Sequence, residues 1–281
     1  MCIRDRVYTD PDYAGLMREA LLSIPTVSVT TDKDNLFDSS QGIYVNTTRT
    51  GDQWERPVSA EYFSRHDTRQ FQIDCGLRLQ GGASRQPYKC PKHSLSLRFR
   101  AKWGPTKLEF PLFEGSPVER FDSIHLRGMF NNSWIHWNPG QRQRAQMIRD
   151  QWMRDSLLEM GEISAGRGIF VHLYLNGIYW GVYNLHERPE ASNYAAYYGG
   201  SSDELDALNG GSVRDGNYNA WNNMKNTVAR RDWDRIQQVL AVDNYIDWTI
   251  IQRFGSNNDL KGNGNWRAAG GGPDTVSYTH L

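Results

Sequence analysis

The sequence predicts an α+β protein, and three observations support this fold class. The first half of the chain contains short runs in which apolar and polar residues alternate, as in half-buried antiparallel strands. Asn176-Gly177 lies between two further strand-like runs, and this pair is preferred in type I′ hairpin turns. The last third has helical periodicity. We therefore expect a β-rich part with one helix, a central hairpin and a helical part, in that order.

The β-rich part is expected to begin with a short helix over 13–22 and to turn at 32–35. The expected strands lie at 24–30, 42–46, 58–63, 71–74, 107–111 and 123–127, and a hairpin with a glycine-rich turn spans 76–100. Apolar residues at helical spacing then predict a helix over 141–160, which Gly161 ends.

The central hairpin is expected over 169–185, with Asn176-Gly177 as its turn. Four helices are expected after it, at 191–198, 221–229, 232–240 and 243–254. Residues 199–219 are polar and rich in Gly, Asn and Ser, which predicts a surface loop.

Length and charge limit the possible functions. The chain has 281 residues, enough for one two-lobed domain or two small domains. It carries 32 basic and 32 acidic residues, so no global basic field would attract nucleic acid or an anionic membrane. No apolar run approaches the roughly 20 residues of a membrane-spanning helix. The 10 Trp and 14 Tyr residues favour a well-packed globular domain.

The two ends of the chain look like translations of one sequencing-adaptor duplex. Residues 1–6 and 276–281 are therefore expected to be adaptor-derived artefacts and are left out of the fold prediction. The remainder is expected to be a fragment. It would comprise a β-rich part over 7–188, with one helix and the central hairpin, and an incomplete helical part over 189–275.

A glycine-rich segment suggests a site that binds an anion. Gly76–Arg85 and Pro91–Arg100 have the pattern of a strand, a glycine-rich turn and a second strand, with Lys92 where the second strand begins. Glycines let backbone N–H groups approach an anion, and a lysine supplies a positive charge for it. The segment therefore predicts a phosphate site, and a plain β-hairpin is the alternative.

Two cysteines flank this turn. For Cys75 and Cys90 two alternatives are open, a disulfide between paired strands of an exported protein or two isolated buried thiols.

Several separated segments resemble, in the same order, the spore-coat-protein-H (CotH) family of atypical protein kinases. These segments are Ile24–Val29 with Gly42–Asn46, Trp54–Pro57, Gly76–Arg85, Pro91-Lys92, Leu126-Arg127, Arg149-Asp150, Leu173–Gly177, Gly181–Arg188 and Asp259–Trp266. The resemblance implies a protein-kinase-like fold with a β-rich N-terminal lobe and a helical C-terminal lobe. It also implies a kinase that uses ATP and Mg²⁺ to phosphorylate Ser or Thr of a protein partner and that is exported or attached to the cell surface.

The resemblance also implies site residues. The nucleotide-binding residues would be Gly81, Gly82, Ala83, Ser84, Arg85, Lys92, Asp150 and Glu187. Asp259 would be the catalytic residue that orients or deprotonates the acceptor hydroxyl. Asn263 or Asn265 would hold Mg²⁺, which prefers oxygen ligands.

Two of these roles have alternatives. Asp150 is expected to pair with Lys92, and a surface pair with Arg154 is the competing interpretation. Glu187 is expected on the adenine side, or else in an ion pair that caps the strand end.

The sequence also departs from the family pattern. His93 occupies a position where the family often has a second lysine, and the family's downstream aspartate motif is absent. We therefore expect weak binding of Mg-ATP.

Further sequence patterns argue against other functional classes. The seven histidines lack metal-ligand spacing, and no Gly-x-Ser-x-Gly motif appears, so a zinc site and a serine hydrolase are not expected. Trp134 and Trp137 are expected in an aromatic core, with a sugar-binding platform as the alternative. The rival function is a non-catalytic pseudokinase, or a glycan- or protein-binding module of an exported surface protein.

Overall fold

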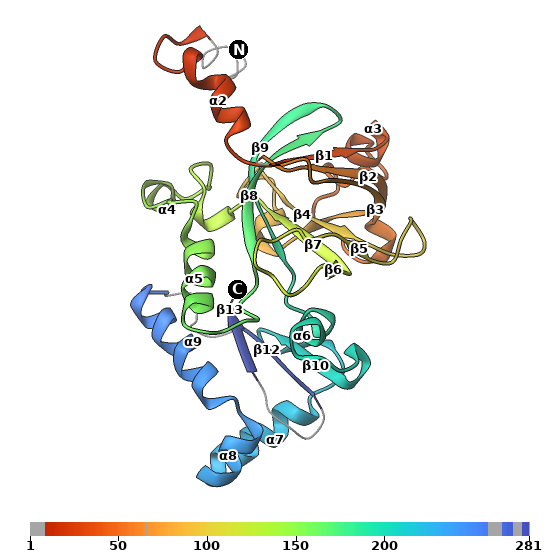
Figure 1. The fold of residues 1–281 in the computed structure, drawn as a ribbon. Coiled ribbons are helices and arrows are strands. Elements are labelled where there is room, and N and C mark those ends of the chain that lie inside the picture. The colour runs from red at the N-terminus through yellow and green to blue at the C-terminus, as the bar shows by residue number, and fades with distance from the viewer. Residues whose placement is uncertain (1–8, 66, 258–265, 272–276, 281) are drawn as a thin grey trace. The chain divides into compact units, whose positions relative to one another are not determined.

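The computed structural model describes residues 9–65, 67–257, 266–271 and 277–280 (Figure 1). The chain divides into two compact units. Unit 1 comprises 1–106, 125–130 and 169–185, and unit 2 comprises 107–124, 131–168 and 186–281. Unit 2 thus includes two segments that precede residue 188, the expected end of the β-rich part.

Most of unit 1 is a closed barrel of strands in the order β1-β2-β3-β4-β7-β9-β8. The pairs β1·β2, β2·β3 and β3·β4 are antiparallel, and β1 pairs with β8 in parallel. The strands are β1 (Thr26–Thr30), β2 (Arg56–Phe63), β3 (Gln70–Gln80), β4 (Ser94–Arg98), β7 (Ser123–Arg127), β8 (Gly168–Leu175) and β9 (Ile178–Glu187).

The alternation in the sequence fixes which side chains enter the core of this unit. Val27 and Val29 on β1 and Leu95 and Leu97 on β4 are almost completely buried. Successive side chains of a strand point to opposite faces, so these apolar residues share one face of their strands. The expected strands at 24–30, 58–63, 71–74 and 123–127 are confirmed within this sheet.

The strand expected at 42–46 is wrong. A short helix, α3 (Lys33–Phe37), replaces the turn expected at 32–35, and the following residues fold back on it. The N–H groups of Ile43 and Tyr44 donate to the carbonyl oxygens of Asn35 and Leu36. A Cβ at Gly42 would lie 2.5 Å from the carbonyl oxygen of Asp38, so this close return requires glycine. Three hydrophobic residues in a five-residue run do not distinguish such a turn from a strand.

The central hairpin is confirmed. Asn176 has φ of 50° and Gly177 has φ of 76°, the two positive values that a type I′ turn requires. The Asn176 side-chain oxygen also accepts a hydrogen bond from the N–H of Thr31, at 2.9 Å, which ties the hairpin to the end of β1.

Unit 2 contains most of the long helices and a small sheet in the order β11-β10-β12-β13. Its helices are α4 (Pro139–Gln143), α5 (Arg149–Glu159), α6 (Ala191–Tyr198), α7 (Asn219–Arg230), α8 (Trp233–Val239) and α9 (Val242–Phe254). Its sheet strands are β10 (Leu205–Asn209), β11 (Ser212–Asp215), β12 (Trp266–Gly271) and β13 (Ser277–His280). The four helices expected after the central hairpin are therefore confirmed.

Two expectations for unit 2 are wrong. The helix expected over 141–160 is interrupted, because Met147 has a positive φ of 58° between α4 and α5. The loop expected over 199–219 contains the β10–β11 hairpin, whose turn has positive φ at Gly210 and Gly211. A Gly-Gly pair is a hairpin signal that the surrounding polar residues obscured.

The remaining regular elements are short. A small helix, α2 (Met17–Leu22), precedes β1, and β5 (Leu108–Glu109) pairs with β6 (Arg120–Phe121) in a two-stranded sheet. Strand β13, in the segment assigned to adaptor sequence, pairs with β12. None of the helices among the described residues has the length and apolar character needed to span a membrane. A large, mostly antiparallel sheet together with several helices agrees with the α+β class.

Candidate functional site

The glycine-rich turn between β3 and β4 depends on the conformation of Gly81. Its φ is +115°, and a Cβ there would lie 2.0 Å from the Oγ of Ser84. Ala83–Arg85 then form a single 3₁₀ turn, and Gly81, Gly82 and Ala83 are exposed. The turn therefore presents backbone rather than side chains to its surroundings, which is what close approach to a phosphate requires.

The buried side chain of His93 holds this turn in place. Its side chain is buried, and its Nδ1–H donates to the carbonyl oxygen of Ser84 at 3.0 Å. Burial lowers the pKa of His93, so the ring is neutral at physiological pH and positions the turn without adding a charge. Its ring also packs against Tyr44, with centroids 5.4 Å apart. The structure thus places His93 behind the turn, as a positioning residue.

Arg85 extends from the end of the turn. Its Nη1 donates to the carbonyl oxygen of Arg49 at 3.2 Å. Burial lowers its pKa, although the guanidinium stays protonated at neutral pH. The side chain therefore connects the turn to the loop before β2.

Lys92 has an unusual environment for a lysine. Its Nζ donates to the carbonyl oxygen of Val182 on β9 and lies 4.3 Å from the centroid of the Tyr183 ring. Gly181 is adjacent, since a Cβ there would lie 3.7 Å from Nζ. Among the described residues no carboxylate lies within ion-pair distance of Lys92. A carbonyl and an aromatic face replace the usual anionic partner.

This environment makes the Lys92 side chain a weaker base than an exposed lysine. Burial lowers the pKa of Lys92 from 10.5 to about 8, and the nearby Cys90 opposes this shift. The ammonium is therefore mostly protonated at pH 7 but lacks a compensating negative charge. An anionic ligand that reached it would supply that charge.

The acidic residue expected to pair with Lys92 lies in unit 2. Asp150 is in the first turn of α5, where a carboxylate favours the helix dipole. Its Oδ1 accepts a hydrogen bond from Nδ2 of Asn132 at 3.3 Å. The pairing of Asp150 with Lys92 remains a prediction.

Glu187 ends β9 and is completely buried. Its carboxylate accepts hydrogen bonds from the hydroxyl of Tyr197, at 2.9 and 2.8 Å, and from the N–H of Arg167 at 2.6 Å. Burial raises its pKa, and these hydrogen bonds together with Arg167 and Arg154 act in the opposite direction. The side chain thus links the end of β9 to α6 and to Arg167, the residue before β8, and its adenine-side role remains a prediction.

The other three expected site residues, Asp259, Asn263 and Asn265, lie outside the described residues. Among the residues that the structure describes, no group of His, Cys, Asp or Glu is arranged to hold a metal ion. Cys75 and Cys90 are both buried free thiols, so the disulfide alternative is not realised.

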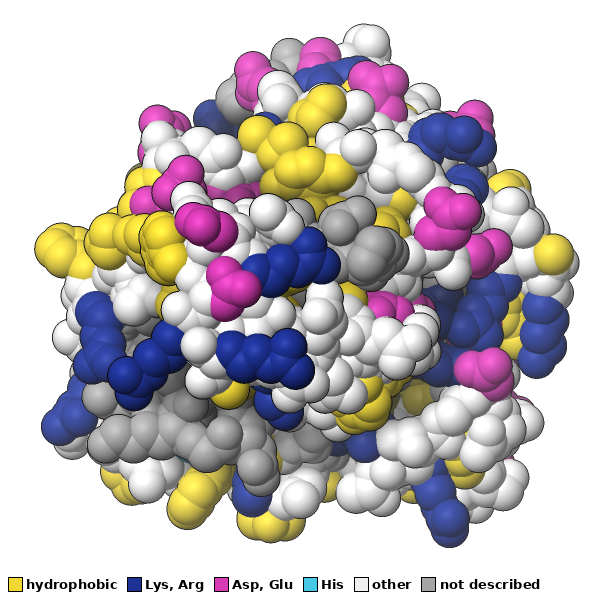
Figure 2. All heavy atoms as spheres, turned by 90° about the horizontal axis from the view of Figure 1, so that it is seen from below, with side chains coloured by type: hydrophobic (Ala, Val, Ile, Leu, Met, Phe, Trp, Pro, Cys, Tyr) yellow, Lys and Arg dark blue, Asp and Glu magenta, His cyan; other side chains and the backbone are white. Residues whose placement is uncertain are grey.

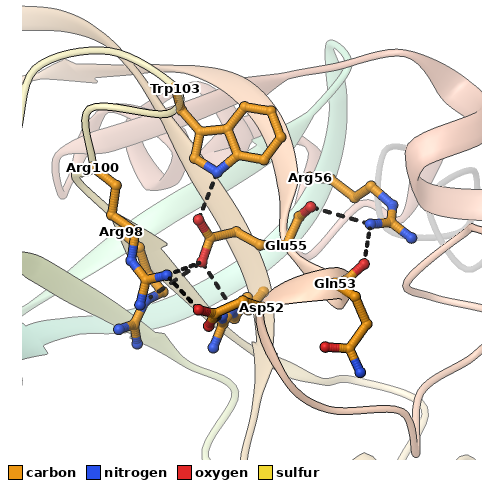
Figure 3. A network of polar contacts seen from close by, with 8 residues as sticks. Asp52, Gln53, Glu55, Arg56, Arg98, Arg100 and Trp103 are labelled. Atoms are coloured by element: carbon orange, nitrogen blue, oxygen red, sulfur yellow. Dashed lines mark hydrogen bonds and ion pairs between the residues drawn. The ribbon is translucent and has the colours of Figure 1, made fainter.

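A polar cluster centred on Glu55 contacts β3 and β4, the strands on either side of the glycine turn (Figure 3). Glu55 is buried, with its Oε2 2.9 Å from Nε of Arg78 on β3 and 3.5 Å from Nε of Arg98 on β4. Its Oε1 accepts a hydrogen bond from Nε1 of Trp103 at 2.5 Å. The exposed Asp52 pairs with Arg78 and Arg100. The segment 54–57, part of the family resemblance, therefore contributes a structural carboxylate.

Sequence reasoning missed the contact of Lys92 with β9, because it joins residues 90 positions apart. Gly181 was the one sequence signal for this contact, because an isolated glycine within a strand often marks close approach by another group.

Comparison with known protein families gives a match to most of the chain. The family model described as CotH kinase protein matches residues 77–269, which include the turn, Lys92, Asp150, Glu187 and the segment around Asp259. Comparison with the curated proteins gives no match. Because the matched region covers more than half of the chain, the chain belongs to the CotH kinase protein family.

Proposed function

We propose that this protein is an atypical protein kinase that transfers the γ-phosphate of ATP to Ser or Thr of a protein partner. The observation that carries the proposal is Lys92, a partly buried ammonium that follows the glycine turn in the sequence and has no carboxylate partner among the described residues. A triphosphate would provide the negative charge that this ammonium lacks. Membership of an atypical kinase family supports the same chemistry.

Each residue has a defined task in this proposal. The exposed backbone of Gly81, Gly82 and Ala83 would donate N–H groups to phosphate oxygens. Lys92 would neutralise charge on the phosphates, and Asp259 would orient the acceptor hydroxyl and accept its proton. Such positioning and charge neutralisation account for most of the catalysis in phosphoryl transfer.

Asn263 or Asn265 would hold a divalent ion, since an amide oxygen is a ligand that Mg²⁺ accepts. Such an ion would supply positive charge that offsets the charge of the phosphates. The described residues provide one test of fit, namely the uncompensated ammonium of Lys92, which suits an anionic nucleotide. We extend the proposal to a two-lobed kinase-like arrangement, with lobes over 7–188 and 189–275, and to an exported or surface-associated protein.

A second candidate is a non-catalytic module that binds glycans. Trp134 and Trp137, expected in a core, are instead 67% and 51% exposed. The Nε1 of Trp134 donates to the carbonyl oxygen of Ala145 at 3.2 Å, which orients its ring. Exposed, oriented indole rings are the surfaces on which sugar rings stack.

Thermal unfolding with different ligands distinguishes the two candidates. A kinase should be stabilised by ATP only when Mg²⁺ is present, and Lys92→Ala should remove this stabilisation. Asp259→Asn should keep the stabilisation and lose transfer of the γ-phosphate to a protein acceptor, because the carboxylate acts on the hydroxyl rather than on ATP.

The opposite pattern would support the glycan module. In that case oligosaccharides would raise the melting temperature, Trp134→Ala would abolish the effect, and ATP would have no effect at any Mg²⁺ concentration. Equal stabilisation of the wild type and of Lys92→Ala by Mg-ATP would contradict the role assigned to Lys92.

A further inference from the structure

Two helices of unit 2, α5 and α9, pack against each other (Figure 1). The faces that meet are apolar, because Met153 and Leu157 of α5 form a buried cluster with Ala165 and with Ile251 of α9. This face holds α9 in the core of the unit. A helix that covers a core in this way normally has a polar outer face.

The outer face of α9 is instead apolar. Ile246, Ile250 and Phe254 are spaced four residues apart, so they form one stripe along the helix. Ile246 and Ile250 are about half exposed, and Phe254 is 77% exposed. A helix that is apolar on both sides is normally covered on both sides. The stripe is therefore a surface that a partner is expected to cover.

The helix α5 widens this stripe. The ring centroid of Trp152 lies 6.1 Å from that of Phe254, and Ile148, one turn before Trp152, is also exposed. We call Ile148, Trp152, Ile246, Ile250 and Phe254 the α5–α9 patch. Their exposed fractions correspond to an apolar surface on the order of 500 Å², and exposed apolar patches of this size are often interaction sites.

The size of the α5–α9 patch fits an interface between two proteins. An interface of standard size buries about 800 Å² on each partner, and about 60% of that area is apolar. An apolar patch of about 500 Å² with a polar rim has both properties. The patch therefore has the area that a protein partner needs.

The charges beside the stripe indicate which partner fits. Asp247 lies three residues before Ile250, and Arg253 lies three residues after it. At about 100° of rotation per residue, these two side chains flank the stripe on opposite sides. Neither forms an ion pair with another of the residues that the structure describes. Asp243, in the first turn of α9, lies beyond the end of the stripe. One flank is therefore acidic and the other is basic.

From these observations we propose that the α5–α9 patch is the interface of a homodimer, in which the same patch of a second copy of the chain covers it. The two α9 helices run parallel on either side of the twofold axis. The acidic flank of each copy then meets the basic flank of the other, so Asp247 pairs with Arg253 twice. Helical side chains lean toward the N-terminus, which brings Arg253 toward the level of Asp247. Antiparallel helices would bring like flanks together.

Sedimentation velocity of the full chain at low salt, over a range of micromolar concentrations, tests the proposal. The wild type should be a dimer. Ile250→Glu should weaken dimerisation about a hundredfold or more, because each copy then places a charge in the apolar interface. Val228→Glu, at an exposed apolar position of α7, is the matched control and should dimerise as the wild type does. Circular dichroism checks that both variants fold.

Charge reversal tests the arrangement of the helices. Asp247→Lys and Arg253→Glu should each weaken dimerisation roughly tenfold or more, because each variant has two like-charge pairs in its interface. An equimolar mixture of the two variants should recover association, since their heterodimer again has two opposite-charge pairs. Mixing could not repair a defect in folding.

A wild type that is monomeric at every concentration would overturn the proposal and leave the patch to another partner. A dimer that Ile250→Glu leaves intact would also overturn it. Failure of the mixed variants to associate would overturn the pairing of Asp247 with Arg253 and with it the parallel arrangement. Lys92→Ala should dimerise normally, so this proposal and the kinase proposal fail separately.

Discussion

At the scale of single residues, the conformation of the glycine turn depends on Gly81. Gly81→Ala should destabilise the fold by about 1–3 kcal/mol, because its positive φ disfavours any side chain and the new Cβ would meet Ser84 Oγ. Chemical denaturation measures this cost.

Adding Ser84→Ala to Gly81→Ala should recover part of the loss, since it removes the clash and leaves only the backbone strain. The control is Gly15→Ala, where a Cβ would meet nothing within 4 Å and φ is not positive. A Gly81→Ala variant as stable as the wild type would show that the turn has a different conformation.

The second residue-scale prediction concerns the pH dependence of stability. Burial lowers the pKa of Lys92 in the folded protein from 10.5 to about 8. Between these pH values the unfolded chain binds a proton that the folded protein does not bind. The free energy of unfolding should therefore rise with pH across this window, relative to a Lys92→Met variant. Below pH 8 both states are protonated and the difference should be constant.

Denaturation curves at several pH values check this result, with the exposed Lys33→Met as a control that should follow the wild type. A constant difference between wild type and Lys92→Met up to pH 10 would show that Lys92 is not buried as described.

At the scale of elements, the buried carboxylate of Glu55 joins β3 and β4 to the segment before β2. Glu55→Gln should cost about 3–5 kcal/mol, because two partly buried guanidinium groups then lose their shared negative charge. Asp52→Asn is the matched control. Its side chain is 75% exposed, so solvent weakens its ion pairs and the loss should stay below about 1 kcal/mol.

Urea denaturation at low and high ionic strength separates the two variants, since salt should reduce only the small effect of Asp52→Asn. Equal losses for both variants would mean that the ion pairs around Glu55 act as surface pairs.

Elements that local sequence determines could be predicted. Asn176-Gly177 specifies its own turn, and the helices after residue 190 have strong periodicity. The interruption at Met147 could not be predicted, because nothing in a methionine signals positive φ. The segment 42–46 was misread because its fold depends on hydrogen bonds to Asn35 and Leu36 rather than on its own pattern.

The candidate site was predictable to a similar degree. The glycines and Lys92 could be found from the sequence because the turn is local. The contacts of Lys92 with Val182 and Tyr183 could not, since they come from a distant strand. Glu187 also illustrates this limit, because its hydrogen bonds to Tyr197 and Arg167 depend on tertiary packing.

At the scale of the whole molecule, charge gives a further prediction. The formal net charge of the chain is zero, and both Lys and Arg side chains and Asp and Glu side chains are seen on the face shown in Figure 2. Retention of duplex DNA in a gel-shift assay at physiological salt should therefore be absent, because sequence-independent binding needs a basic surface that releases counterions. A shift that declines steeply with salt would contradict this expectation.

The central proposal is that Mg-ATP binds at the glycine turn and Lys92. Hydrogen exchange followed by mass spectrometry, with and without Mg-ATP, tests it most directly. We predict slower exchange in peptides covering 81–92, with the effect lost in a folded Lys92→Ala variant. Unchanged exchange in this segment at saturating Mg-ATP would contradict the account.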